Sequence, residues 1–134
     1  MEAVKKTQLA RKKHDDAVRA WKTLRDILEA EKTVVTRDAA IQRFEYTTEA
    51  VWKCLQLYLK ERDGIECYSP KMCLREAKNV GLLDEQETVL ALEMIDDRNM
   101  TSHAYHEEVA EKIYVKLPLY AGVMNKLLDA MEQG

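Results

Sequence analysis

Apolar side chains recur at steps of three or four residues through the last third of the chain. They are Val109, Ile113, Leu117, Tyr120, Met124, Leu127 and Met131. An α-helix has 3.6 residues per turn, so this spacing lines them along one side of a helix. A second stripe of the same kind runs through residues 41–59. Stripes of this length have to be buried against one another, which predicts packed helices rather than sheets.

The composition agrees with a helical fold. The 134 residues include only 4 glycines and 2 prolines, too few for the many tight turns of a β-sandwich or barrel. A chain of this length buries roughly two thirds of its unfolded surface in a single core. We therefore predict one all-α domain over residues 1–134, an antiparallel up-and-down four-helix bundle with one extra short helix.

Local signals set the expected boundaries of the first two helices. The first helix is predicted over about residues 2–30, with His14 on its buried side. The β-branched run at 33–36 disfavours helix, so we expect it to form the first connection. The second helix is then capped by Thr36 or Asp38, and it ends before a glycine that suits a left-handed cap.

Capping residues predict the later helices in the same way. Ser69 precedes a short helix over 70–79, and Asp84 caps a helix that ends near Met100. The last helix should be kinked or locally broken at Pro118. The apolar positions expected to be buried in the short helix and the one after it are Met72, Cys73, Ala77, Val89, Leu92 and Ile95.

Charge and cysteine content limit where the protein acts. The net charge is -3, so no global positive field gathers nucleic acid, and any RNA contact must be local. No apolar run approaches the roughly 18 residues of a membrane span, and we expect a cytoplasmic protein that does not bind membranes. Cys54, Cys67 and Cys73 match no zinc or redox spacing, so we expect reduced thiols.

The stretch from residue 98 to 108 departs from plain amphipathic helix. Arg98, His103 and Tyr105 place a fixed cation, a titratable imidazole and a phenol at one helix junction, which can bind and cleave a phosphodiester. The structural alternative is that Arg98 pairs with Asp96 or Asp97 while His103 and Tyr105 only stabilise the junction. Spacing alone favours that alternative, because Arg and His are common near helix ends.

Two further charged groups have two interpretations each. Glu45 and Glu49 share a helix face, but the histidines of a di-metal bundle are absent. We therefore expect no metal and no cofactor, and we assign these carboxylates to pair with Arg43, Lys53 or Arg98. The basic first half of the first helix is either a solvated face or, less favoured, an RNA or partner contact.

Three blocks resemble the nucleotidyltransferase substrate-binding family, a branch of the HEPN superfamily that includes the HepT-type toxins. The first covers 41–46 with Glu49 and 52–53, and the second runs from 69 to 84. The third covers 97–105 and 110–114, and its Arg98, His103 and Tyr105 match the family pattern of Arg, four residues, His, one residue and Tyr without a gap.

The resemblance implies a homodimer that works beside a separately encoded minimal nucleotidyltransferase. In the ribonucleases of the superfamily, the Arg and His of both protomers meet at the dimer cleft and cleave RNA without metal. Carried over, Arg98 would hold the phosphate and His103 would transfer the proton, with Thr101 and Ser102 orienting the phosphate. Tyr105 resembles the tyrosine that partner enzymes modify by adding AMP.

Three functions follow from these observations. The first is a substrate-binding partner subunit of a toxin–antitoxin-like nucleotidyltransferase system, with RNA or a nucleotide as its ligand. The second is a metal-independent ribonuclease toxin that its nucleotidyltransferase partner neutralises. The third is a helical dimer in which the Arg98 motif is only structural. A homodimer is also predicted from the aromatic flanks Trp21, Trp52 and Tyr114, which exceed what one buried seam needs.

Overall fold

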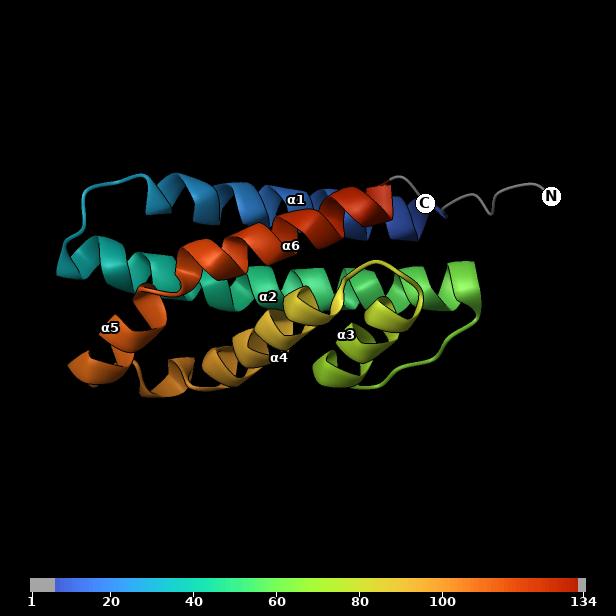
Figure 1. Ribbon diagram of the computed structural model, residues 1–134. Coiled ribbons are helices and arrows are strands. Elements are labelled where there is room, and N and C mark those ends of the chain that lie inside the picture. The colour runs from blue at the N-terminus through green and yellow to red at the C-terminus, as the bar shows by residue number, and fades with distance from the viewer. Residues whose placement is uncertain (1–6, 133–134) are drawn as a thin grey trace.

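The computed structural model describes residues 7–132, and in this range all regular structure is helical. Figure 1 shows the arrangement. The elements in chain order are α1 (Gln8–Leu28), α2 (Val34–Asp63), α3 (Pro70–Asn79), α4 (Glu85–Asn99), the short 3-10 helix η1 (Thr101–His103), α5 (Glu107–Tyr114) and α6 (Leu117–Glu132). The predicted all-α class is confirmed.

The helix α2 is the centre of the fold. It has 30 residues and contacts each of the other α-helices. In Figure 1, α1 and α6 lie along one side of α2, α3 and α4 lie along the other, and α5 sits near the end where α2 begins. The helices α1 and α2 run in opposite directions (Figure 1). Residues that project from α2 toward α3, α4 and α5 therefore decide where the later helices sit.

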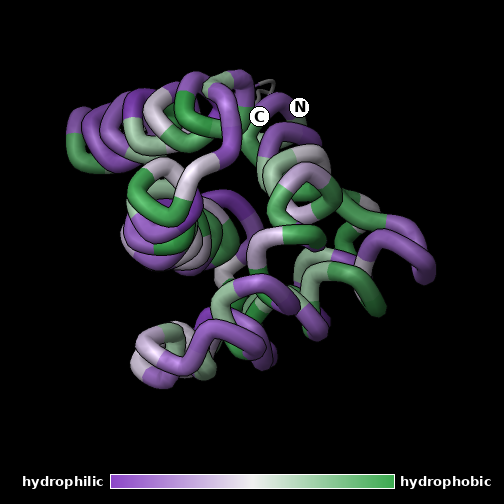
Figure 2. Tube along the Cα trace, turned by 90° about the vertical axis from the view of Figure 1, so that its left-hand side faces the viewer, coloured by the Kyte–Doolittle hydropathy of each residue, from purple (hydrophilic) through white to green (hydrophobic). Residues whose placement is uncertain are grey.

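The core forms where the stripe of α2 meets that of α6. Phe44 of α2 stacks on Tyr120 of α6, with ring centroids 5.5 Å apart, and both side chains are fully buried. Val109, the first residue of the predicted apolar repeat, is half-buried. The other members are buried: Ile113, Leu117, Tyr120, Met124, Leu127 and Met131. Figure 2 shows the alternation of hydrophobic and hydrophilic bands along the helices. Truncating one such leucine to alanine typically costs about 2–5 kcal/mol.

Hydroxyl caps place the first two helix starts differently from the sequence prediction. The Thr7 side chain accepts a hydrogen bond from the Ala10 amide and caps α1, while the predicted start at Glu2 lies outside the described residues. The helix α2 already begins at Val34, because Thr33 and Thr36 form a reciprocal capping box. The prediction of a connection at 33–36 is wrong, since the capping bonds outweigh the weak β-branched preference against helix.

The later caps are confirmed, with two errors in the buried face. Gly64 has the left-handed φ of 68° that ends α2, and Ser69 and Asp84 cap α3 and α4. Met72 and Val89 are exposed rather than buried, Val89 by 62%. Thr88 takes the buried place beside Val89 because its hydroxyl donates to the Asp84 carbonyl and is therefore satisfied inside the fold.

The last predicted helix is two helices. The chain leaves α5 at Val115 and starts α6 at Leu117, so Pro118 lies in the first turn of α6. A proline is tolerated there because the amide it lacks would have no partner inside the helix. The predicted break is confirmed, and it lets α5 turn toward the start of α2.

The cysteines differ from the prediction. Cys67 and Cys73 form a disulfide that ties the α2–α3 connection to α3, so reduced thiols are the wrong assignment for these two. The turn at Ser69 and Pro70 folds the chain back and brings the two Cα atoms to 5.3 Å. Cys54 lies apart from them in the core, with its sulfur 4.0 Å from that of Met131. Within residues 7–132, no helix has the length and apolar character to cross a membrane.

Candidate functional site around Arg98

The last turn of α4 holds Arg98 against α2. Its Nη2 donates to Oε2 of Glu49 at 2.7 Å, and 33% of the side chain is exposed. The carboxylates next to it in sequence are used elsewhere: Asp96 pairs with Lys71 at 2.6 Å, and Asp97 accepts a hydrogen bond from the Tyr120 hydroxyl. The predicted Glu49 pairing is confirmed, and the alternative pairing with Asp96 or Asp97 is wrong.

The groups around Glu49 keep its carboxylate ionised. Its Oε2 also accepts from the Trp52 indole at 3.0 Å, and its Oε1 lies 3.2 Å from the Lys53 ammonium. Burial acts to raise the pKa of Glu49, but the hydrogen bonds from Trp52 and Lys53 and the charge of Arg98 together bring it below its ordinary value. Glu49 is therefore a fixed negative group that orients the guanidinium of Arg98.

The guanidinium of Arg98 has donor capacity left over. Its Nε is buried and has no hydrogen-bond partner within the described part of the chain. Among the residues that the structure describes, its Nη1 donates only to Asn99, at 3.5 Å. Arginine carries five N–H donors, and a buried donor without an acceptor is unfavourable. An added oxyanion could accept hydrogen bonds from the exposed part of this guanidinium, although not from the covered Nε.

Two hollows adjoin Arg98 and share it as a lining residue. One, of about 510 Å³, lies over α2 between Tyr46 and Lys53. The other, of about 420 Å³, lies toward Trp52 and the start of α3 at Ser69. Glu49 lines both. The guanidinium is therefore reachable from solvent at the boundary of two depressions, which is where an anionic ligand can approach it.

The segment after Arg98 is tied to α4 by local hydrogen bonds. The Thr101 hydroxyl donates to the Arg98 carbonyl at 2.8 Å, and the His103 amide donates to the Met100 carbonyl at 2.9 Å. Ser102 and His103 are exposed, and Tyr105 is 78% exposed with its ring 4.2 Å from that of His106. This segment presents its polar side chains to solvent beyond the end of α4.

Arg98 and His103 lie on either side of the end of α4, Arg98 in its last turn and His103 in η1. The described residues show no hydrogen bond joining the two side chains, and the His103 ring has its nearest aromatic neighbour in Tyr105, with centroids 6.5 Å apart. The predicted residues are thus gathered at one end of α4.

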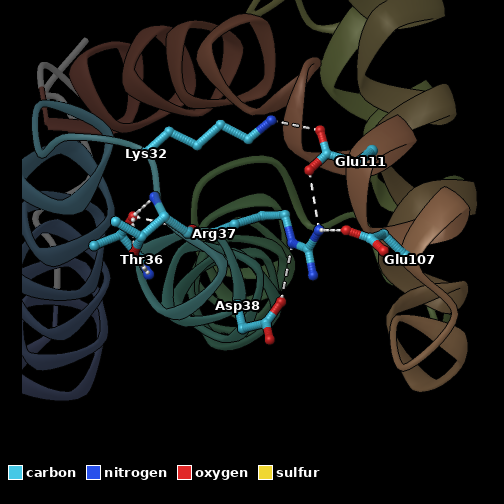
Figure 3. Close-up of polar contacts among 7 residues, drawn as sticks. Lys32, Thr36, Arg37, Asp38, Glu107 and Glu111 are labelled. Carbon is cyan, nitrogen blue, oxygen red and sulfur yellow. Dashed lines mark hydrogen bonds and ion pairs between the residues drawn. The ribbon is translucent and has the colours of Figure 1, made fainter.

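A second arginine forms a charge cluster that the sequence interpretation missed. Arg37 lies in the first turns of α2 with only 6% of its side chain exposed. Its Nε donates to Asp38 at 3.1 Å, and its Nη1 donates to Glu111 at 3.0 Å and lies 3.5 Å from Glu107. Figure 3 shows these carboxylates around the guanidinium, with Lys32 reaching Glu111 from the other side.

The electrostatics of this cluster are mutually stabilising. The hydrogen bond to Glu111 raises the pKa of Arg37 against the effect of burial. The pKa of Glu111 is lowered, first by the hydrogen bond from Lys32 and then by that from Arg37. Both groups stay charged, and together they fasten α5 to the start of α2.

The Arg37 cluster holds the helix that follows the candidate site. The helix α5 starts at Glu107, only two residues after Tyr105, so holding α5 also fixes where the 101–106 segment ends. One sequence signal pointed to it: Arg37 stands four residues before Ile41 and seven before Phe44, on the buried stripe of α2. A charged residue on such a stripe predicts a buried ion pair.

Comparison with known proteins agrees with this geometry. Residues 12–133 match the family described as "Nucleotidyltransferase substrate binding protein like". A crystal structure of a protein from Thermus thermophilus is similar, with 49% identity and a TM-score of 0.83, covering 86% of this chain and 98% of that one.

Two relatives come from Haemophilus influenzae. One is a structure described as the fold of a substrate binding domain of a nucleotidyltransferase, with 25% identity, a TM-score of 0.72, and coverage of 89% of this chain and 98% of that one. The other is a curated protein named "Probable ribonuclease HepT", 33% identical over 98 residues. That match covers 70% of this chain and 66% of the relative's length.

The fold and the family match together define a class, the all-helical substrate-binding domains of nucleotidyltransferases. This chain belongs to the nucleotidyltransferase substrate-binding protein family.

Proposed function

We propose that this chain is the substrate-binding partner subunit of a separately encoded minimal nucleotidyltransferase, as in toxin–antitoxin-like pairs. We further propose that it acts as a homodimer with a four-helix up-and-down core. The family match and the Haemophilus influenzae fold described as a nucleotidyltransferase substrate binding domain support the pairing. A chain of this class carries the recognition surface, while the transfer chemistry belongs to the partner.

The observation that carries the proposal is the unsatisfied guanidinium of Arg98. It is oriented by one carboxylate, that of Glu49, and its buried Nε lacks an acceptor among the described residues. A planar guanidinium binds phosphate through hydrogen bonds, so a phosphate group in the adjoining hollows would accept from the exposed part of Arg98. In this proposal Ser102 and Thr101 flank the bound phosphate, and Tyr105 stands at the rim.

The exposed apolar surface near Arg98 supports a dimer. Met100 caps the end of α4, Tyr105 follows five residues later, and Tyr46 lines one hollow with Arg98; they are 43%, 78% and 42% exposed. Large side chains gathered at one exposed place favour an interface. A two-fold axis over this face would set two copies of Arg98 and His103 in one cleft, which is the arrangement that a single chain does not provide.

Co-purification with the nucleotidyltransferase encoded next to this chain tests the main proposal. We expect a stable complex at micromolar concentration, and light scattering should give the mass of a dimer for this chain alone. Absence of association at that concentration would refute the partner role. A monomer in solution would refute the shared cleft without touching the partner role.

A second function, metal-independent cleavage of RNA, is favoured by the exposed imidazole of His103 and by the relative named as a ribonuclease. In this reaction one imidazole takes the proton of a 2′-hydroxyl, and the 2′-oxygen forms a bond to phosphorus. The bond from phosphorus to the 5′-oxygen breaks, and that oxygen leaves with a proton from an imidazolium. The products are a 2′,3′-cyclic phosphate and a 5′-hydroxyl, while Arg98 neutralises the phosphorane charge.

Incubation of the pure protein with total RNA in EDTA tests this second function. We expect cleavage that His103→Ala abolishes, with Lys112→Ala as a matched control on an exposed residue of α5. An inert wild-type protein would refute the ribonuclease and leave the partner role standing.

The exposed phenol of Tyr105 is also the proposed target for AMP transfer by the partner. A nucleotide on Tyr105 would add negative charge at the rim and repel substrate phosphates. Intact-mass measurement after incubation with the partner and ATP should show one added AMP in the wild type. It should show none in Tyr105→Phe, and an equal mass gain in that variant would refute the assignment.

A further inference from the structure

A further pocket lies where α1, α2 and the α2–α3 connection meet, and it shares Lys53 with one of the two hollows at Arg98. Its volume is about 480 Å³, within the range of small-molecule sites. Lys13 enters from α1, Lys53 and Lys60 enter from α2, and Tyr68 enters from the connection. Lysines from two helices therefore converge on one hollow.

The pocket has the opposite charge to the chain as a whole. Three lysines and a single glutamate, Glu66, are its charged lining residues, while the full chain has a net charge of -3. Lys53 forms an ion pair with Glu49. Neither Lys13 nor Lys60 has a carboxylate partner within residues 7–132. Local positive charge on an acidic protein attracts an anion to this place specifically.

The part of the pocket formed by the α2–α3 connection is fixed and carries an aromatic side chain. Gln56 of α2 donates from Nε2 to the Cys67 carbonyl at 2.7 Å, and Cys67 is itself held by the disulfide to Cys73. The next residue, Tyr68, is 74% exposed, and its hydroxyl donates to Glu66 at 2.8 Å. The connection is thus anchored at Cys67, and the Tyr68 ring is oriented but uncovered.

We propose that this pocket binds a nucleoside triphosphate. The ammonium groups of Lys13, Lys53 and Lys60 take the phosphates, for which lysine acts as a point charge. The Tyr68 ring offers a surface on which a base stacks, an interaction that tolerates any base. The Glu66 carboxylate, which already accepts from the Tyr68 hydroxyl, also accepts hydrogen bonds from a ribose hydroxyl or a base amino group. This site is additional to the two hollows at Arg98, and it goes beyond the proposed function.

Calorimetric titration of the full chain with ATP in EDTA tests the site. We expect saturable binding that weakens as salt is raised, and weakens at least tenfold in the double variant Lys13→Ala with Lys60→Ala. The matched control is Lys78→Ala with Lys112→Ala, which removes two exposed lysines outside the pocket and should change the affinity less than twofold. Thermal unfolding of each variant confirms that it is folded.

Two further probes separate the phosphate contacts from the base contact. Inorganic tripolyphosphate should bind through the lysines, and Tyr68→Ala should leave its affinity unchanged while weakening ATP. Failure of the wild type to bind ATP would overturn the proposal, as would equal loss in both lysine double variants. Binding of a single-stranded oligonucleotide but not of ATP would also overturn it. Because neither the partner nor Arg98 takes part, failure here leaves the proposed function untouched.

Discussion

The fold uses two arginines in opposite ways. Arg37 is 6% exposed as a side chain and has three carboxylates within ion-pairing distance, from Asp38, Glu107 and Glu111. Arg98 is 33% exposed and has one, from Glu49, while its Nε stays without a partner among the described residues. Both bridge α2 to a later part of the chain. Only Arg37 has several carboxylates around its charge.

The difference separates a structural cation from a binding one. A guanidinium surrounded by carboxylates has no reason to attract a further anion, and it stabilises the fold by holding its partners charged. A guanidinium oriented by one carboxylate and short of acceptors is prepared for a phosphate. The number of hydrogen-bond acceptors around each arginine therefore distinguishes a structural role from a binding role better than its burial does.

The largest expected effect on stability comes from the complete cluster. Arg37→Met should lower the thermal midpoint by roughly 5–10 °C, because it removes the nearly buried cation that joins α2 to Glu111 of α5 and leaves Glu111 with Lys32 as its partner. Circular dichroism melts measure this, with Arg75→Met on the exposed face of α3 as the control. A melt equal to the control would show that Arg37 does not hold α5 in place.

Arg98 should show the reverse pattern. Arg98→Met should leave the melting temperature within about 2 °C of wild type, because the pair with Glu49 is partly solvated. The same variant should weaken binding of a phosphate-bearing substrate about 10- to 100-fold, the effect of losing charge-assisted hydrogen bonds. A large loss of stability with unchanged binding would instead support the purely structural interpretation of this motif.

Acid titration sharpens the comparison further. The pKa of Glu111 is lowered in the folded protein from its ordinary value of 4.5, so the fold binds fewer protons there than the unfolded chain. Its stabilising contribution is therefore complete above about pH 4.5, and it is lost as the pH falls through the folded pKa. The difference in melting temperature between wild type and Glu111→Gln should be full at neutral pH and shrink as the solution is acidified below that value. A difference independent of pH would contradict the assigned charge pairing.

The smallest effect is expected at the edge of the cluster. Glu107 is 77% exposed and 3.5 Å from Arg37, so its charge is largely screened by water. Glu107→Gln should shift the midpoint by less than about 2 °C, as should Glu108→Gln at the next exposed position. A clearly larger shift for Glu107 than for Glu108 would mean that Arg37 depends on all three of its carboxylates.

Much of the fold could be predicted because its signals are local. The stripe from Ile113 to Met131, the left-handed Gly64 and the caps at Ser69 and Asp84 depend on residues within a few positions of each other. One error arose where one local preference opposed another. At the start of α2, two threonine hydroxyls form caps in a run whose β-branched side chains disfavour helix, and the caps decide the outcome.

The candidate site was predictable only in part. The order of Arg98, His103 and Tyr105 gave its members, and the i,i+4 carboxylates suggested Glu49 as a partner. The orphaned Nε of Arg98 could not be predicted, because it depends on which side chains of α2 cover that atom. The Arg37 cluster joins residues about 70 positions apart in the sequence, and no role was therefore predicted for Arg37 from the sequence.

The sequence by itself determined that this chain is helical, where most helices start and stop, and which residues gather at the junction after α4. Hydrogen bonds and apolar periodicity within a few turns suffice for that. Only the tertiary structure decided which arginine is satisfied, which two cysteines meet, and which lysines share a pocket. Those outcomes depend on the packing of α1, α4 and α5 around α2, and charge pairing across such distances is set by three-dimensional separation rather than by order along the chain.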